Sequence, residues 1–271
     1  MDDEPKKITP YTPILKSKKM SLEDSLETME KGQKVFIVGI CGGQGGGKTK
    51  LSKVLSEKVS KSEVIEERNF FKPQSTQRKL SRGDEHLVGE FGGYSKKRKI
   101  LLVELSNPQS YDYEKLYNTL QKLIKGESVY IRQFNEETGE YTNEQQEINP
   151  EETNLIIVEG YFLFRDEKVR NLINLKIYSE VDDDIRLSRL LINENKFLNN
   201  NPVAFKYFFL IYEQFIKYSY EQNIAPTKQY AKIILPNYTV NKNQTIEENG
   251  DDTLKLLITN LQNLPNRKKY V

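Results

Sequence analysis

Short apolar runs alternate along the chain with longer segments in which apolar residues recur every three or four positions. The short runs are typical of buried strands and the longer segments of amphipathic helices. The expected strands are 35–40, 63–66, 154–160, 175–181 and 231–236. The expected helices include 49–60, 112–124, 203–223 and 253–264. Strands that alternate with helices predict an α/β fold with a mainly parallel sheet and helices on both faces.

Residues 128–148 depart from this alternation and repeat with a period of two. The segment Glu137-Thr138-Gly139-Glu140 lies at its middle and has the composition of a tight turn. The pattern therefore predicts a small β-hairpin inserted between the helix that ends near Gly126 and the strand at 154–160.

A glycine-rich stretch joins the first strand to the first helix. It reads Gly42-Gly43-Gln44-Gly45-Gly46-Gly47-Lys48-Thr49 and fits G-x-x-x-x-G-K-[ST] at every fixed position. Glycines let backbone N–H groups turn inward around an anion, and the helix N-terminus adds its positive dipole end. We expect Lys48 to reach the β- and γ-phosphates and Thr49 to hold Mg²⁺. The sequence thus predicts a site for a nucleoside triphosphate, ATP with Mg²⁺.

One acidic residue ends the strand at 154–160. In nucleotide-binding sheets, the carboxyl end of a buried strand carries the carboxylate that holds the metal or orders water. Glu159 stands at this place. We therefore predict that Glu159 and Thr49 form the metal site and that Glu159 also takes part in catalysis with Lys48.

Composition and charge narrow the class of protein. The 41 basic and 39 acidic residues nearly cancel, and this balance argues neither for nor against a nucleic-acid partner. No nucleic-acid partner is expected. The single cysteine, Cys41, excludes a disulfide framework and is interpreted as a structural residue. No apolar run approaches the ~18 residues of a membrane span. The acidic N-terminus lacks a secretory or transit signature, so a cytoplasmic location is expected, with an organellar assembly left open.

Several segments lie outside this core or carry unusual side chains. Residues 34–264 are interpreted as the domain. Residues 1–33 form an N-terminal extension, either a solvated tail or a docking arm, and residues 265–271 form a basic C-terminal tail.

The helix at 203–223 carries an aromatic stripe, which is typical of a core or a partner surface. The basic run at 96–99 and the single His86 are expected to be solvated.

Five motifs in chain order resemble the phosphoribulokinase/uridine kinase family. The glycine loop is the first. The others read Asn107-Pro108-Gln109-Ser110-Tyr111-Asp112 for H-P-D-A-F-D, Val158-Glu159-Gly160-Tyr161-Phe162-Leu163-Phe164 for V-E-G-I-L-A-F, Asp184-Ile185-Arg186-Leu187-Ser188-Arg189 for D-T-R-L-x-R, and Pro226-Thr227-Lys228-Gln229-Tyr230-Ala231-Lys232-Ile233-Ile234-Leu235-Pro236 for P-T-K-K-Y-A-D-V-I-I-P. The resemblance implies a P-loop NTPase fold with a helical lid at about 184–202.

The same resemblance implies a changed acceptor side. The family's general-base aspartate, in D-S-F-Y after the second strand, falls on Arg68, and a guanidinium cannot act as a base. Asp112, Glu66 and Glu67 are the candidate replacements.

Other acceptor-side and lid positions also differ. The second sugar-binding aspartate falls on Ser106. The residues of the hairpin that read the nucleobase fall on Phe134 and Gly139, and three lid arginines fall on Leu190, Asn193 and Asn200. Arg189 is the lid cation that we expect to remain at the phosphates, with Arg186 and Lys196 as further candidates.

Two functional hypotheses follow. In the first, which the losses on the acceptor side favour, the protein is a catalytically degenerate, ATP-binding pseudokinase. It would serve as a structural or accessory subunit of a larger assembly and dock through its N-terminal arm and the helix at 203–223. In the alternative, it is an active Mg²⁺-ATP-dependent kinase that phosphorylates a hydroxyl of a nucleoside-like or other small metabolite. A GTPase switch is disfavoured because the late strands carry no N-K-x-D motif.

Overall fold

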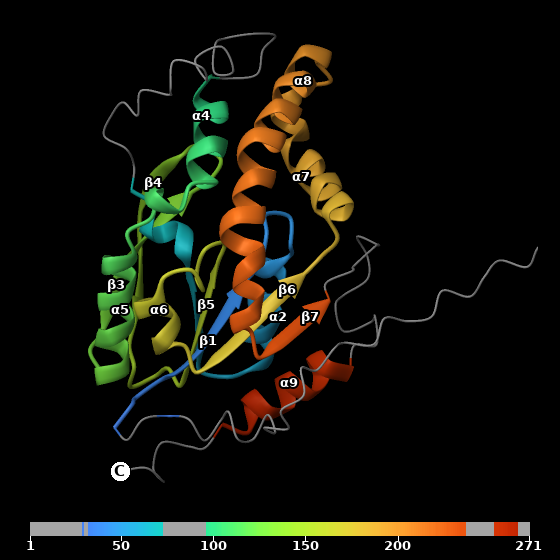
Figure 1. Ribbon diagram of the computed structural model, residues 1–271. Helices are drawn as coiled ribbons and strands as arrows, with labels where there is room; N and C mark the ends of the chain where they lie inside the picture. The colour runs from blue at the N-terminus through green and yellow to red at the C-terminus, as the bar shows by residue number, and fades with distance from the viewer. Residues whose placement is uncertain (1–28, 30–31, 73–95, 237–251, 265–271) are drawn as a thin grey trace, which may run out of the picture.

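The computed structural model describes residues 29, 32–72, 96–236 and 252–264. Within them, five parallel strands form one sheet in the order β2-β5-β1-β6-β7 (Figure 1). Their bounds are β1 Phe36–Cys41, β2 Ser62–Glu66, β5 Leu155–Gly160, β6 Leu175–Glu180 and β7 Ile233–Pro236. Every residue of β1 and β5 is buried, because both strands lie inside the sheet and are covered on two faces. The predicted parallel sheet is confirmed.

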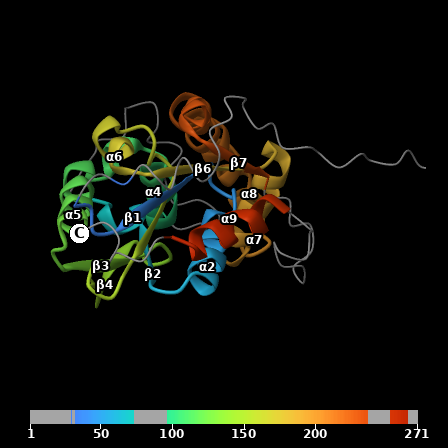
Figure 2. The same cartoon turned by 90° about the horizontal axis from the view of Figure 1, so that it is seen from below.

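Helices cover both faces of this sheet (Figure 2). Helices α2 (Lys48–Lys58) and α9 (Asp252–Gln262) pack on the face that carries Phe36, Val38 and Ile40. Helices α5 (Tyr113–Lys125) and α6 (Glu167–Leu172) pack on the opposite face. Successive strand residues point to opposite faces, so an unbroken apolar run such as β1 supplies both layers of the core.

The hairpin and the lid rise above the carboxyl ends of the strands. Strands β3 (Val129–Asn135) and β4 (Glu140–Ile148) pair antiparallel and confirm the predicted hairpin. A short helical turn, η1 (Glu67–Phe70), follows β2 and anchors the hairpin. The amide of Phe134 donates to Asn69 Oδ1 over 2.9 Å, and the Tyr141 hydroxyl donates to the carbonyl of Phe71 over 2.5 Å. These bonds hold the hairpin tip near the end of β2.

The lid consists of α7 (Asp183–Leu198), followed by a long helical segment. This segment begins as α8 (Pro202–Ile211), continues with π-helical turns at Tyr212–Lys217 and Tyr220–Ile224, and ends with a 3₁₀ segment at Ala225–Tyr230. Much of its aromatic stripe is intramolecular core, since Phe208, Tyr212 and Ile216 pack against α4 (Lys96–Leu105) and α7. Val203, Phe209 and Tyr218 remain exposed. The partner surface expected on this helix stays a prediction.

The basic run at 96–99 corrects the sequence-based expectation of a solvated stretch. It begins helix α4 (Lys96–Leu105), in which Arg98 and Lys99 are buried. The Lys99 ammonium lies 4.2 Å from the centroid of the Tyr207 ring. Leu101, Leu102 and Leu105 of this helix are buried in the core. Their packing also removes Arg98 and Lys99, which precede them in the helix, from water.

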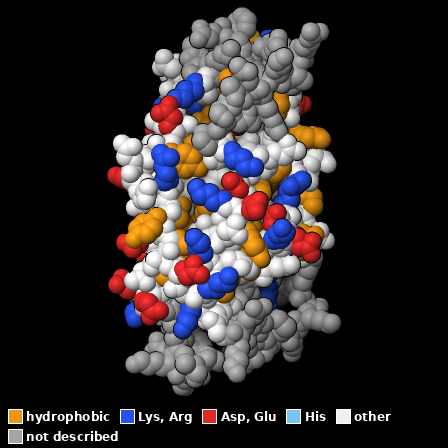
Figure 3. Space-filling view, turned by 90° about the vertical axis from the view of Figure 1, so that its left-hand side faces the viewer, with side chains coloured by type: hydrophobic (Ala, Val, Ile, Leu, Met, Phe, Trp, Pro, Cys, Tyr) orange, Lys and Arg blue, Asp and Glu red, His pale blue; other side chains and the backbone are white. Residues whose placement is uncertain are grey.

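Some expectations fall outside the described residues: those for His86, for residues 265–271 and for most of the N-terminal extension. No helix in the described ranges is long and apolar enough to cross a membrane. On the face formed by α5 and the hairpin, acidic and basic side chains are interspersed (Figure 3). A nucleic-acid site of the ordinary kind needs a basic stripe, which this face does not present.

Candidate active site

The glycine loop at 42–47 connects β1 to α2 in a conformation that requires glycine. Gly45 has φ +73°, and a Cβ at this position would lie 2.6 Å from the carbonyl oxygen of Arg186. Gly47 caps α2 with φ 77°. Both angles belong to the left-handed region, which residues with a Cβ rarely adopt. The loop can therefore wrap closely around the N-terminus of α2, where unpaired N–H groups and the dipole favour an anion.

Thr49 and Glu159 are brought together as predicted. The Thr49 hydroxyl donates to Glu159 Oε1 over 2.7 Å. The second oxygen, Oε2, is buried and has no hydrogen-bond partner in the part of the chain that the structure describes. Burial raises the pKa of Glu159, because a carboxylate without full hydration is costly. A hydroxyl beside a carboxylate with an unsatisfied oxygen is a donor set that suits Mg²⁺.

Lys48, the first residue of α2, is buried beside the loop. Its ammonium donates to the carbonyl of Gly43 over 3.0 Å and lies 4.0 Å from the centroid of the Tyr161 ring. Burial lowers the pKa of Lys48 to about 8, against the opposing charge of Glu159. An anion bound in the loop would favour the protonated amine. This end of the site is therefore arranged for negative charge.

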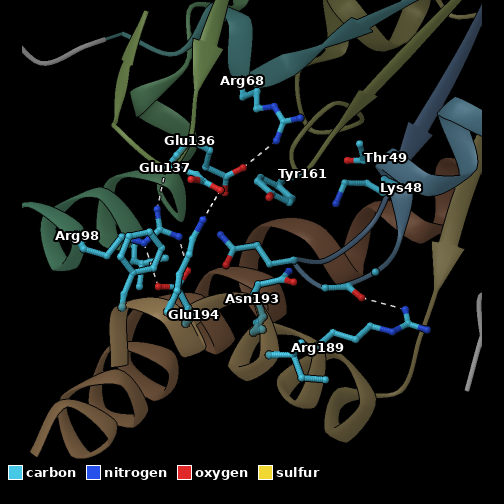
Figure 4. Close-up of a pocket in the computed structure, with 18 of the residues that line it drawn as sticks. Lys48, Thr49, Arg68, Arg98, Glu136, Glu137, Tyr161, Arg189, Asn193 and Glu194 are labelled. Carbon is cyan, nitrogen blue, oxygen red and sulfur yellow. Dashed lines mark hydrogen bonds and ion pairs between the residues drawn. The ribbon is translucent and has the colours of Figure 1, made fainter. Parts of the chain in front are cut away.

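A cavity of about 990 Å³ opens beside Lys48 and Thr49 (Figure 4). Its walls are the glycine loop, the η1 turn, the hairpin tip and lid helix α7. Arg189 reaches back from the lid and donates to the carbonyl of Gly45 over 3.0 Å, so the predicted lid cation lies at the loop. Leu190 and Asn193 also line the cavity, at places where the family resemblance implies arginine.

Arg68 lies on the wall opposite the loop. Its Nε donates to Glu66 Oε2 over 2.5 Å, and its Nη1 donates to Glu136 Oε2 over 2.8 Å. In Figure 4, Glu136 lies beside Arg68, and the Tyr161 ring lies between Glu136 and Lys48. The wall expected to hold an acceptor therefore presents a guanidinium flanked by two carboxylates.

The model of the Phosphoribulokinase / Uridine kinase family matches residues 37–244. The chain belongs to this family. A uridine kinase of Borrelia duttonii is 31% identical over 205 residues, which cover 74% of this chain and 86% of that protein. A uridine kinase of Streptococcus agalactiae is 28% identical over 206 residues, 75% of this chain and 88% of that protein.

A solved structure described as a "putative fructose transport system kinase" from Silicibacter sp. TM1040 has a TM-score of 0.51 and 19% identity. The match covers 79% of this chain and 95% of that one. At this identity the similarity establishes the fold alone. It agrees with the parallel sheet and the glycine loop described above.

Two of the carboxylates expected to replace the family's base lie elsewhere. Glu67 is 2% exposed and is not among the described residues that line the cavity. Its Oε2 accepts from the amides of Tyr161 (2.6 Å) and Phe162 (3.1 Å), and its Oε1 accepts from the Tyr113 hydroxyl. Burial raises the pKa of Glu67 to about 7. These hydrogen bonds connect η1 to the end of β5, so the role of Glu67 is structural.

Asp112 caps helix α5 and corrects the second of these expectations. Its Oδ1 accepts from the amide of Lys115 over 3.0 Å, and it lines a separate depression between α5 and β3. The side chain is committed to the start of a helix. This placement removes Asp112 from the candidates for the base. Glu66, the remaining candidate, is paired with Arg68.

Replacing Glu67 with glutamine should flatten the pH dependence of stability. Folded Glu67 keeps its proton up to about pH 7, whereas the free side chain releases it near 4.5. Between these values the folded state binds more protons, so the unfolding free energy falls as pH rises, by on the order of 3 kcal/mol. Urea unfolding at pH 5 and pH 8 measures the fall. An equally steep fall in Glu67→Gln, with exposed Glu127→Gln as the control, would contradict the assignment.

Sequence reasoning missed Arg98, Glu194 and Glu137, which line the cavity together with Lys196, a lid cation that the sequence does indicate. Arg98 forms a buried ion pair with Glu194 of α7, and its Nη1 donates to the carbonyl of Glu136 over 2.6 Å. Lys196 pairs with Glu137 at the hairpin tip. These partners come from separate helices and the hairpin, and no motif or spacing links them. The basic run at 96–99 was the one visible signal, and its charge had suggested solvent.

Cys41 has the structural role that the sequence predicts. It is fully buried, its thiol donates to the carbonyl of Tyr161 over 3.2 Å, and burial raises its pKa to about 11. A thiol of this kind is not a nucleophile at neutral pH. The residue therefore belongs to the packing behind the loop.

Proposed function

We propose that this protein is a Mg²⁺-ATP-dependent kinase that transfers the γ-phosphoryl group to a hydroxyl of a small metabolite. The observation that carries this proposal is the pairing of Thr49 with Glu159, whose second oxygen is buried and unsatisfied. Lys48 and Thr49 line one cavity, and the charge of Glu159 acts on Lys48. The relatives named uridine kinases support the reaction class.

The chain's own residues divide the work as follows. The loop at 42–47 and the first turn of α2 cradle the phosphates, and Lys48 neutralises charge on the β- and γ-phosphates. Thr49 and Glu159 hold the metal, and Arg189 presents a second cation from the lid. Mg²⁺ at this position would supply charge stabilisation to the transferring phosphoryl group.

The acceptor in this proposal is a nucleoside-like or other small hydroxyl compound. Uridine itself is not favoured, because Ser106 and Phe134 occupy places where the family resemblance implies sugar- and base-reading residues. Both are buried, and Ser106 donates to the carbonyl of Leu102 over 2.8 Å. A different acceptor is therefore expected on this wall.

A second candidate function rests on Arg68. A guanidinium at the place of the family's base favours an ATP-binding accessory protein without catalysis, docking through the N-terminal extension or the helix at 203–223. A bound ligand can stabilise a fold by several kcal/mol when it far exceeds its Kd, which would preserve the loop. The names of the relatives favour the kinase over this alternative.

The deciding experiment follows transfer of labelled γ-phosphate from ATP to nucleosides, sugar phosphates and small alcohols, with ATP binding measured in parallel by calorimetry. Transfer to an acceptor that stops when EDTA removes Mg²⁺ is the expected result. Tight ATP binding without transfer to any acceptor would support the accessory protein instead.

Glu159→Gln should raise the Mg²⁺ concentration needed for half-maximal transfer by about 10–100-fold, because the variant loses one charged metal ligand. A titration of MgCl₂ at fixed ATP measures the shift. Glu57→Gln on the exposed face of α2 is the matched control and should leave the titration unchanged. An unshifted curve for Glu159→Gln would exclude it as a metal ligand.

A further inference from the structure

We propose that Glu136, at the tip of the hairpin, is the carboxylate that accepts the proton of the acceptor hydroxyl, and that Arg68 positions it. This inference rests on the kinase function proposed above and names the base for that reaction. The base would then come from the hairpin, although the resemblance places it directly after the second strand.

The first observation is the location of Glu136. It lines the same cavity as Lys48, Thr49 and Tyr161. In Figure 4 its carboxylate lies beside Tyr161, on the side of the ring away from Lys48. Burial dominates the lowered pKa of Lys48, and Glu136 is one of the carboxylates that oppose it. Glu136 and Lys48 therefore border the same cavity from opposite sides of the Tyr161 ring.

The second observation is that Glu136 is held from two sides. Its Oε2 accepts from Arg68 Nη1 over 2.8 Å, and its backbone carbonyl accepts from Arg98 Nη1 over 2.6 Å. Its side chain keeps 29% of its surface exposed. A general base needs both a fixed position and access to the substrate. A residue at the tip of a hairpin meets both needs only when such contacts restrain it.

The other carboxylates among the described residues of the cavity wall are otherwise engaged. Glu194 is 3% exposed at its side chain and is paired with Arg98. Glu137 is paired with Lys196 at the rim. Glu159, which is not among those lining residues, accepts from the Thr49 hydroxyl. Glu136 thus combines access with a position opposite the glycine loop.

Arg68 takes on a new task in this arrangement. Its guanidinium donates to Glu136 Oε2, and the planar geometry of a guanidinium orients the carboxylate with which it pairs. The family resemblance implies an acidic residue at position 68. This chain has Arg68 there, and Arg68 pairs with an acidic residue of the hairpin, Glu136. Although position 68 carries arginine in place of the family's aspartate, the acceptor side therefore still has a negatively charged carboxylate, that of Glu136.

The chemical step balances with these groups. The acceptor oxygen forms a bond to the γ-phosphorus of ATP while its proton passes to the Glu136 carboxylate. The bond between the γ-phosphorus and the bridging oxygen breaks, and its electron pair leaves with ADP. Arg68 remains protonated throughout, so the proton stays on Glu136 until solvent removes it.

The test uses the full chain with the best acceptor from the transfer assay. Glu136→Gln should lower kcat about 10²-fold and leave the KM for ATP and the melting temperature unchanged. Glu144→Gln, at an exposed position of β4 that is not among the described residues lining the cavity, is the matched control and should keep kcat within about threefold. A merely structural role for Glu136 would move the melting temperature or the KM together with kcat.

A rescue variant separates the chemistry from the packing. Arg68→Asp combined with Glu136→Gln places a carboxylate at the position implied by the family, and kcat should recover at least tenfold over Glu136→Gln. Wild-type kcat in Glu136→Gln would overturn the inference while leaving the kinase intact. A wild-type protein that transfers phosphate to no acceptor would instead overturn the proposed function itself.

Discussion

Lys48→Ala lowers the rate of phosphoryl transfer by about 10³-fold or more. A cation that neutralises the transferring phosphoryl group is worth at least this factor in related reactions, and Lys48 is the buried ammonium at the loop. Initial rates with labelled ATP at saturating acceptor measure the loss. Lys53→Ala, an exposed lysine on the same helix, is the control and should retain the full rate.

The same variant gives a readout that does not depend on catalysis. Since burial holds the pKa of Lys48 at about 8, part of the population is neutral near that pH. A bound polyphosphate raises this pKa, so ATP binding at pH 8 should take up protons. Calorimetry in buffers of different ionisation enthalpy measures the uptake. Equal uptake by wild type and Lys48→Ala would assign the protons to another group.

Arg98→Met destabilises the folded protein by about 3–5 kcal/mol. The variant removes the guanidinium that pairs with Glu194, whose side chain is only 3% exposed, in a contact between α4 and α7. A buried carboxylate without its cation must either stay charged at high cost or take up a proton. The midpoint of urea unfolding measures the loss.

A double variant distinguishes the pair from general packing. Arg98→Met with Glu194→Leu replaces both charges by apolar groups of similar size, so most of the lost stability should return. Lys97, the residue before Arg98, forms an exposed ion pair with Glu140. Lys97→Ala should therefore lower the free energy of unfolding by no more than about 1 kcal/mol. A loss for Arg98→Met no larger than that of Lys97→Ala would show that the buried pair contributes little.

The local sequence predicts the residues on the phosphate side of the site but not those on the acceptor side. On the phosphate side, Lys48 and Thr49 stand at fixed positions between a strand and a helix, so their placement follows from one continuous segment. Glu159 joins them because β5 pairs with β1 in parallel, opposite Ile40. The carboxyl ends of neighbouring parallel strands meet at one edge of a sheet, and this rule is enough to bring the acid to the loop.

The acceptor side follows no such rule. Arg68 and Glu136 are 68 residues apart, and Arg98 and Glu194 are 96 residues apart. Each pair joins elements whose mutual approach depends on how the hairpin and lid pack over the sheet. The sequence therefore shows that the aspartate at 68 is missing, and it offers Asp112, Glu66 and Glu67 as replacements. Asp112 caps a helix, Glu67 accepts buried hydrogen bonds, and Glu66 is paired with Arg68.

By itself, the sequence determined the parallel α/β sheet, the glycine loop with Lys48 and Thr49, and the acid at the end of β5. These features arise from local periodicity, backbone freedom and strand direction, which a linear pattern records. Only the tertiary structure decided that Arg98 is buried and that Glu136 lines the same cavity as the phosphate loop. Desolvation and the pairing of charges depend on distance through space, and that distance is set by the packing of elements that lie far apart along the chain.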